Sequence, residues 1–443
     1  MTDHRQSRLL GPMMSIAMVV GLIIGAGVFL LPTSIAPFGI NMFIGWALTI
    51  GGFLSLAYAF SALASRIDGG PYEYVKQGFG EQAAFLTNWS YLVSNWAGGA
   101  AVAVAFAGAL ARVSPALAAP GLVAPLSIAA VAVLAAIAYT GARSAGWTQV
   151  VTTLLKTVPL MLVIVIAAAV LLSGGKAEPL ADAPVTFGNV AAVAAIMAFS
   201  LLGFEAASFA ACKTADARRV VPIATMAGTA LTGLIYVLAC TAVVMLVPLD
   251  RLSTSTQPFA DAIAGSLGEG AGTMVALFVA ISALGALNAM LMISGEIGYD
   301  MGRDCSAPAI LGRNNRFGMP ALALVSSAAA VIVLIMMNSS RSLSGLFTFF
   351  VLLTTVSSLF LYAVVAAVAL KQPLRRIARL VALVALIFAL WTFYGAGLEA
   401  FLWGLALLAI GWPIRWASRR FNSSASTSPA PEHAPAAPPG SSA

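Results

Sequence analysis

The sequence predicts an all-α polytopic membrane protein with about twelve transmembrane helices, and three observations lead to this prediction. Hydrophobic residues make up 60% of the 443 residues and charged residues only 9%, whereas about 25% of the residues in a soluble globular protein are charged. The apolar residues are grouped into segments long enough to cross the roughly 30 Å hydrocarbon core of a bilayer. Lys and Arg are distributed unequally between the loops that join these segments.

The apolar segments follow one another from residue 12 to residue 417, which we take as the membrane domain. Each segment is expected to be a helix because a helix satisfies its own backbone hydrogen bonds inside lipid. The expected segments are 12–38, 40–65, 84–112, 121–141, 147–173, 187–212, 219–248, 272–301, 320–337, 343–370, 377–394 and 397–416. Residues 1–11 form a short polar tail, and residues 418–443 are rich in Ser, Pro and Ala, which is typical of a disordered tail.

The positions of the basic residues predict the orientation of the chain. If the N-terminus is cytoplasmic, eighteen of the 23 Lys and Arg residues lie on the cytoplasmic side. Four lie on the opposite side, namely Arg112, Lys176, Arg251 and Arg341, and Lys156 lies within a segment. Cytoplasmic loops carry an excess of Lys and Arg, so both termini are expected to be cytoplasmic. The first apolar run is too long for the core of a signal peptide, and we expect it to remain in the mature protein.

The first segment carries two glycines, Gly25 and Gly27, near its centre, followed by Pro32. Glycine costs about 1 kcal/mol relative to alanine in a helix interior, so this pair favours an interruption of the helix. Backbone groups freed at membrane depth have to line a cavity or bind a ligand. Close packing against another helix explains the small residues equally well.

The sixth segment has a similar feature, because Gly203 lies within it and Glu205 follows two residues later. Interrupted segments five spans apart are typical of secondary transporters built from inverted repeats. The first repeat is then expected at about 12–173 and the second at about 187–370, with two additional helices at about 377–416.

Two charged residues are expected at membrane depth, Glu205 in the sixth segment and Lys156 in the fifth. A charge at the bilayer centre costs about 2.5–3.5 kcal/mol on insertion scales, and such residues usually face a cavity or a partner. Glu205 is a candidate to bind a proton or a cation. Lys156 is a candidate to replace a sodium ion by binding the carbonyl groups freed in the first segment. Either charge can instead serve only to tie helices together, and the same holds for Asn95 in the third segment.

Several motifs resemble those of the amino acid–polyamine–organocation (APC) superfamily, and more narrowly those of the bacterial basic amino-acid/polyamine antiporters, which include the arginine/agmatine type. These motifs are IIGAGVFLLP at 23–32, GGPYEY at 69–74, GFEAAS at 203–208 and RRVVPIAT at 218–225. The resemblance extends from about residue 15 to residue 417. It implies a LeuT-like fold with a 5+5 inverted repeat in which helices 1 and 6 are broken in the middle of the membrane.

The resemblance also implies a substrate site. The substrate carboxylate is expected at the backbone N–H groups of Ala26 and Gly27, next to Gly25. The α-amino group is expected at carbonyls around Ile23, Phe199 and Leu202. Glu205 occupies the position of a pH-sensing glutamate, and Phe199 stands where the relatives have a gating tryptophan.

Three positions differ from the arginine-exchanging relatives. Gly99 stands where they have an asparagine, and Met290 (or Leu287, with a different gap) stands where they have a tryptophan on the eighth helix. Lys156 is similar to the fifth-helix lysine of sodium-independent, proton-coupled permeases. A guanidinium group would lose a polar partner and a stacking surface here, which favours neutral or apolar amino acids.

We therefore predict a secondary active amino-acid transporter, an antiporter or permease, that is sodium-independent and proton-linked and works by alternating access. It is expected in a bacterial-type cytoplasmic membrane, with an amino acid or amine, protons and lipid as partners. A homodimer is one expected arrangement, and no nucleic acid, metal or cofactor is expected. The alternatives are an arginine/agmatine or other basic amino-acid/polyamine exchanger and a transport-dead nutrient sensor. An ion channel and an intramembrane enzyme are less favoured, because the sequence offers neither a filter repeat nor clustered catalytic groups.

Overall fold

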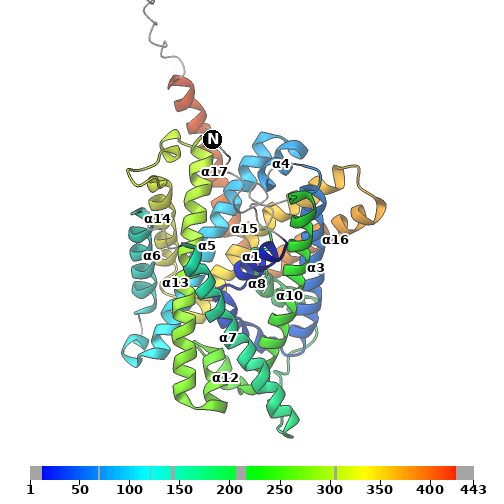
Figure 1. Ribbon diagram of the computed structural model, residues 1–443, viewed down its shortest axis with the longest axis vertical. Helices are drawn as coiled ribbons and strands as arrows, with labels where there is room; N and C mark the ends of the chain where they lie inside the picture. The colour runs from blue at the N-terminus through cyan, green and yellow to red at the C-terminus, as the bar shows by residue number, and fades with distance from the viewer. Residues whose placement is uncertain are drawn as a thin grey trace, which may run out of the picture.

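The computed structural model describes residues 12–67, 70–119, 121–140, 145–205, 216–303 and 307–425. Every regular element formed by these residues is a helix, as Figure 1 shows. In chain order the elements are α1 (Pro12–Ile23), η1 (Ala26–Leu30), α2 (Leu31–Ile35), η2 (Ala36–Phe38), α3 (Asn41–Ala64), α4 (Pro71–Phe79), α5 (Glu81–Val113), η3 (Pro115–Ala118), α6 (Val123–Tyr139), α7 (Ala145–Leu172), α8 (Phe187–Ser200), α10 (Ala217–Leu246), α11 (Leu249–Leu252), α12 (Pro258–Leu267), α13 (Glu269–Arg303), η5 (Ala309–Gly312), α14 (Ala321–Met337), α15 (Leu343–Lys371), α16 (Arg376–Gly395) and α17 (Gly397–Ala425).

Eight helices of the described chain are long and apolar enough to cross a membrane. They are Asn41–Ala64, Glu81–Val113, Leu155–Leu172, Arg218–Leu246, Glu269–Arg303, Leu343–Lys371, Arg376–Gly395 and Gly397–Ser418. The expected first, fourth, sixth and ninth segments contain shorter apolar helices, namely Gly27–Phe38, Val123–Tyr139, Phe187–Ser200 and Ala321–Met337. The prediction of an all-α polytopic membrane protein is therefore confirmed.

The ends of the chain differ in part from the expectation. Helix α17 continues to Ala425, so residues 418–425 are helical although the sequence assigned them to the tail. Residues 415–421 contain no Gly or Pro, which is compatible with continuation of the helix. The expected tails at 1–11 and 426–443 lie outside the described residues.

Helix α5 lies at the centre of the bundle. It packs against α13 and α15 along its length, and it also contacts α4, α6, α14, α17 and η1. In Figure 1, α6 and α14 lie on one side of the bundle and α3 and α16 on the other. The middle of α5 consists of small residues from Ala97 to Ala101, all buried. Small residues let neighbouring helices approach closely inside a membrane, which places α5 next to the break in the first segment.

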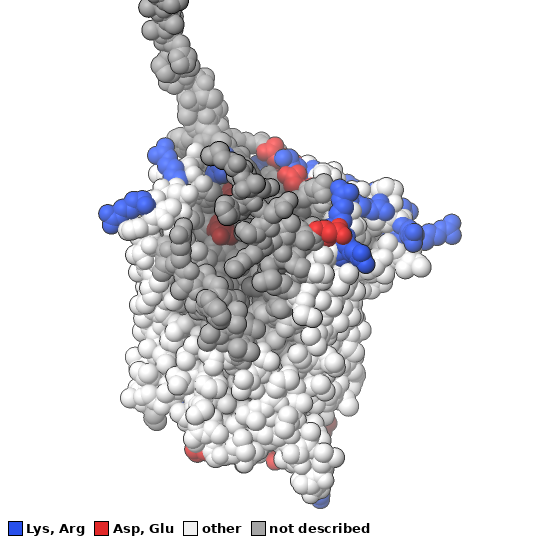
Figure 2. Space-filling model, in the orientation of Figure 1, with Lys and Arg blue, Asp and Glu red and all other residues white. Residues whose placement is uncertain are grey.

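The two ends of the bundle carry different charges. Figure 2 shows Lys and Arg gathered at the upper end, above a largely uncharged band on the visible face. At the Lys- and Arg-rich end, Lys371 donates to the Gly78 carbonyl and Arg415 to the Glu81 carbonyl. At the opposite end Arg112 pairs with Asp261 and Glu269. Because α5 begins with Glu81 and has Arg112 in its last turn, it spans the distance between the two ends.

Candidate binding site

The first apolar segment is interrupted at the position of its glycines. Helix α1 ends at Ile23, and Gly25 has extended backbone angles of φ −90° and ψ 171° before η1 begins at Ala26. The Gly25 N–H donates to the Ile23 carbonyl at 2.6 Å, which closes a tight turn. The chain therefore leaves α1 and starts a second helical stretch within one membrane-spanning segment.

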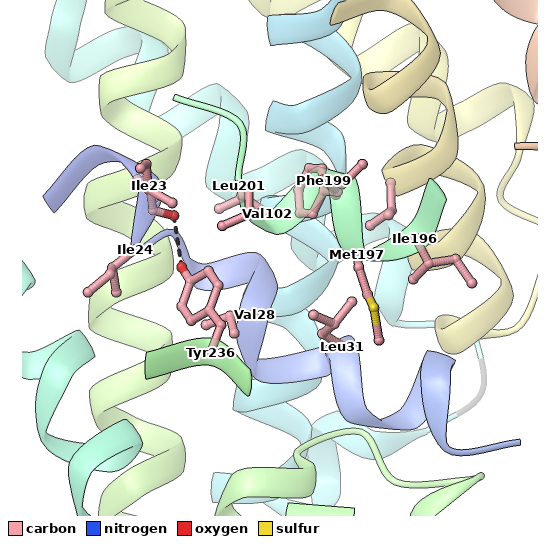
Figure 3. Packing of buried hydrophobic residues seen from close by; sticks show 14 of the residues in the cluster. Ile23, Ile24, Val28, Leu31, Val102, Ile196, Met197, Phe199, Leu201 and Tyr236 are labelled. Atoms are coloured by element: carbon pink, nitrogen blue, oxygen red, sulfur yellow. Dashed lines mark hydrogen bonds between the residues drawn. The ribbon is translucent and has the colours of Figure 1, made fainter. Parts of the chain in front are cut away.

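The Ile23 carbonyl, at the end of α1, is bound by a residue that the sequence did not single out. Tyr236 of α10 is fully buried, and its hydroxyl donates to this carbonyl at 2.8 Å (Figure 3). A buried tyrosine hydroxyl usually finds a hydrogen-bond partner. The sequence could have indicated this contact, because a tyrosine in the largely apolar run 219–248 needs a hydrogen-bond acceptor when it is buried.

Helix α8 ends within the sixth apolar segment, at Ser200. The Leu202 N–H still reaches the Phe199 carbonyl, at 3.3 Å, and Gly203 then adopts a φ of +101°. This left-handed conformation is accessible to glycine without steric cost, so Gly203 allows the chain to leave the helix here. The expected continuation of this segment through residue 212 lies outside the described residues from 206 onward.

Phe199 and Gly27 bring the two interrupted segments into contact. The Phe199 ring lies so close to Gly27 that a methyl group added there would be 2.2 Å from its Cε1 atom. Figure 3 shows this ring beside the break, together with Leu201 and Val102. The ring also meets Phe347 of α15 edge-on, with ring centroids 6.3 Å apart. Phe199 thus covers the break, and Phe347 is a second aromatic neighbour that the sequence did not reveal.

Glu205 lies just after the α8 terminus and is 1% exposed. Tyr91 of α5 donates its hydroxyl to Oε1 at 2.9 Å, and the Gly203 N–H donates to Oε2 at 3.1 Å. The phenol of Tyr362 on α15 also faces this carboxyl group. These two hydrogen bonds compensate for the cost of burying the carboxyl group. The bond from Tyr91 also links the end of α8 to α5.

Lys156 of α7 is 2% exposed, so the side chain is buried within the protein. Within the described part of the chain it forms neither an ion pair nor a hydrogen bond. The expected hydrogen bond to a carbonyl of the first break is therefore absent there, and the Ile23 carbonyl is held by Tyr236 instead.

Three further predicted residues lie on α5 and α13. Asn95 donates its amide to the Tyr91 carbonyl at 2.8 Å, within its own helix. A methyl group added at Gly99 would meet Leu287 and Val331, each at 3.6 Å. One added at Gly98 would meet Met290 at 3.3 Å. Leu287 rather than Met290 is thus opposite Gly99, and Gly99 packs against apolar side chains.

Backbone donors and acceptors lie at the helix ends beside the break. The N–H groups of Ala26 and Gly27 begin a helical stretch, where amide groups lack acceptors within the helix. The carbonyls of Ile23 and Phe199 lie at the ends of α1 and α8, where the first accepts from Tyr236 and the Gly25 N–H and the second from the Leu202 N–H. Interrupted helices in a polytopic helical bundle are typical of secondary transporters. These features are those of a membrane transporter.

Comparison with known proteins identifies the family. The amino acid permease family matches residues 10–416, and the chain belongs to this family. It is 30% identical over 426 residues to the arginine/ornithine antiporter of Pseudomonas aeruginosa, covering 89% of this chain and 88% of the relative. It is 28% identical over 335 residues to the cadaverine/lysine antiporter of Escherichia coli (strain K12), covering 73% and 74%. It is 25% identical over 403 residues to the putrescine transporter PotE of the same organism, covering 88% and 91%.

These findings confirm the family resemblance indicated by the motifs. The relatives are antiporters or transporters by name, and the chain is accordingly a transporter and not an enzyme.

Proposed function

We propose that this protein is a secondary active amino-acid exchanger that binds its substrate between the interrupted first and sixth segments. The contact of the Phe199 ring with Gly27 carries this proposal, because it joins the two interruptions at one buried point. The N–H groups of Ala26 and Gly27 hold the substrate carboxylate, and the carbonyls around Ile23, Phe199 and Leu202 hold the ammonium group. Phe199 moves off Gly27 when the substrate enters and then closes over it.

The same proposal includes the arrangement of the chain in the membrane. We place twelve spans in a LeuT-like 5+5 inverted repeat, with repeat one at about 12–173 and repeat two at about 187–370. Both termini are placed in the cytoplasm of a bacterial-type cell, because the Lys- and Arg-rich end is then cytoplasmic. Alternating access exposes the break first to one side of the membrane and then to the other.

Proton coupling is assigned to Glu205 and Lys156. Glu205 is buried next to the end of α8, so a change in its charge alters the hydrogen bonds with Tyr91 and the Gly203 N–H. Lys156 supplies a positive charge at membrane depth without a described partner. We propose that this charge makes a sodium ion unnecessary.

The apolar surroundings of Gly99 support neutral or apolar substrate side chains. Gly99 faces Leu287 and Val331, so a guanidinium or ammonium group on the substrate would find no polar partner there. A second candidate is an exchanger of basic amino acids and amines. The names of the relatives favour this candidate, since they refer to lysine, cadaverine, arginine, ornithine and putrescine.

Counterflow in proteoliposomes tests the proposal and separates the two candidates. Purified protein is reconstituted, the vesicles are loaded with one unlabelled compound, and uptake of radiolabelled leucine, arginine and putrescine is measured. We expect saturable uptake that depends on a loaded amino acid and continues without sodium. Strong exchange of arginine or putrescine without exchange of leucine would establish the second candidate. Binding without counterflow of any compound would instead indicate a sensor.

A further inference from the structure

A cavity lined by both polar and apolar residues lies at the end of the bundle opposite the Lys- and Arg-rich end. Its volume is about 540 Å³, within the range of about 300–1,000 Å³ that is usual for ligand pockets. Its wall combines the helical stretch after the break, the start of α15 and the start of α17. The residues that matter here are Thr33, Ser34, Arg341, Thr348, Phe349 and Glu399. We call this cavity the outer vestibule.

One positive and one negative side chain line the outer vestibule. Arg341 forms an ion pair with Glu399, and its guanidinium group lies 4.4 Å from the centroid of the Phe349 ring. The two side chains are 33% and 59% exposed. Ion pairs with this much solvent contact contribute little to stability. A ligand with both a carboxylate and an ammonium group can therefore replace the contact between Arg341 and Glu399 at a small cost in free energy.

Helices α2 and α15 link the outer vestibule to the candidate binding site. The hydroxyl groups of Ser34 and Thr348 lie 3.1 Å apart and join α2 to α15 at the vestibule wall. Phe347, the residue before Thr348, packs edge-on against Phe199. Phe199 in turn covers Gly27. Helix α15 thus contributes Thr348 and Phe349 to the vestibule and Phe347 to the aromatic contact beside the break.

We propose that the outer vestibule is a separate binding site for an amino-acid zwitterion on its way to or from the break. Arg341 binds the carboxylate, Glu399 binds the ammonium group, and Phe349 contacts the side chain. An anion alone would be repelled by Glu399 and a cation alone by Arg341, so the pair selects molecules that carry both charges. This inference rests on the proposed exchange of amino acids, because it assigns the first contact of the substrate from the outer side.

Transport measured separately from each face tests the proposal. The double variant Arg341→Gln/Glu399→Gln removes both charges together, so that neither is left without its partner. Exchange of the amino acid that native protein transports best is measured in right-side-out and in inside-out membrane vesicles. We expect KM at the outer face to rise about tenfold, since a hydrogen bond to a charged group is lost. We expect the maximal rate and KM at the inner face to stay within about twofold, as for sites that do not interact.

The inner face serves as the folding control, because a misfolded variant loses transport in both orientations. The matched control is Asp250→Asn/Arg251→Gln, which removes one charge of each sign from α11 without altering the residues that line the vestibule. An unchanged outer KM in the Arg341/Glu399 variant would overturn the vestibule site, as would equal changes at both faces or in the control. Absence of exchange by native protein would instead refute the proposed function.

Discussion

The hydroxyl of Tyr236 donates a hydrogen bond of 2.8 Å to the carbonyl of Ile23, so α10 occupies a backbone group freed by the break in the first segment. The Gly25 N–H binds the same carbonyl. In the proposed substrate complex, the ammonium group binds at this carbonyl too. Substrate binding then displaces one of these donors, which links the occupancy of the site to the position of α10.

Replacing Tyr236 with Phe removes only the hydroxyl group. The Ile23 carbonyl keeps the Gly25 N–H, so we expect a loss of about 0.5–1.5 kcal/mol in the stability of the empty protein. We also expect substrate to bind more tightly, because it no longer competes with Tyr236. Thermal unfolding of purified protein with and without amino acid measures both effects. The control is Tyr58→Phe, which removes the hydroxyl group of a half-buried tyrosine on α3. Weaker substrate binding in Tyr236→Phe would contradict competition at this carbonyl.

Replacing Gly27 with Ala places a methyl group 2.2 Å from the Phe199 ring, so the ring has to move off the break. We expect exchange to fall at least tenfold, as overpacking in a well-packed interior costs about 1–3 kcal/mol. The additional change Phe199→Ala makes room for the methyl group and is expected to restore the native melting temperature in part. Gly51→Ala is the control, because no atom lies within 4 Å of the added methyl group. Native exchange in Gly27→Ala would show that the contact is not part of the site.

Lys156→Met replaces a buried charge by an apolar side chain of similar length. Because Lys156 has no partner among the described residues, we expect a higher melting temperature, consistent with the cost of about 2.5–3.5 kcal/mol for a central charge. We expect exchange to fall in the same variant, since the charge is proposed to act in transport. Lys176→Met, at an exposed position, should change neither quantity. A lower melting temperature with native exchange would indicate a purely structural role.

Glu205→Gln keeps the size of the side chain but removes its charge and its ability to bind a proton. We expect the exchange rate to lose most of its dependence on pH, measured as counterflow over a pH series. The variant Tyr91→Phe keeps the carboxyl group while removing its hydrogen bond, and it should retain a pH response. Glu73→Gln, with a 40% exposed side chain on α4, is the control for loss of charge alone. A native pH profile in Glu205→Gln would exclude Glu205 as the coupling group.

The sequence could predict those features in which a glycine pair or a charged residue occurs within an apolar segment. Gly25 and Gly27 interrupt an apolar run, and the structure has its break between α1 and η1 at these residues. Glu205 and Lys156 are charges within apolar segments, and both are buried. Such residues are costly in lipid, so their presence in the sequence is informative.

The contacts of these residues could not be predicted in the same way. Tyr236 lies more than two hundred residues after Ile23 in the sequence, and its pairing depends on how α10 packs against α1. Asn95 could have reached a ligand, but its bond to the Tyr91 carbonyl satisfies it within α5. Whether Leu287 or Met290 faces Gly99 depends on the rotation of α13, which an apolar segment leaves undetermined.

Substrate binding at the break can be observed in a structure of the protein in lipid nanodiscs with a bound amino acid that the counterflow assay has identified. The proposed binding mode predicts density for the amino acid between residues 25–27 and residues 199–202, with its ammonium group at the Ile23 carbonyl and the Phe199 ring displaced from Gly27. An amino acid bound elsewhere while the Phe199 ring stays against Gly27 would contradict it.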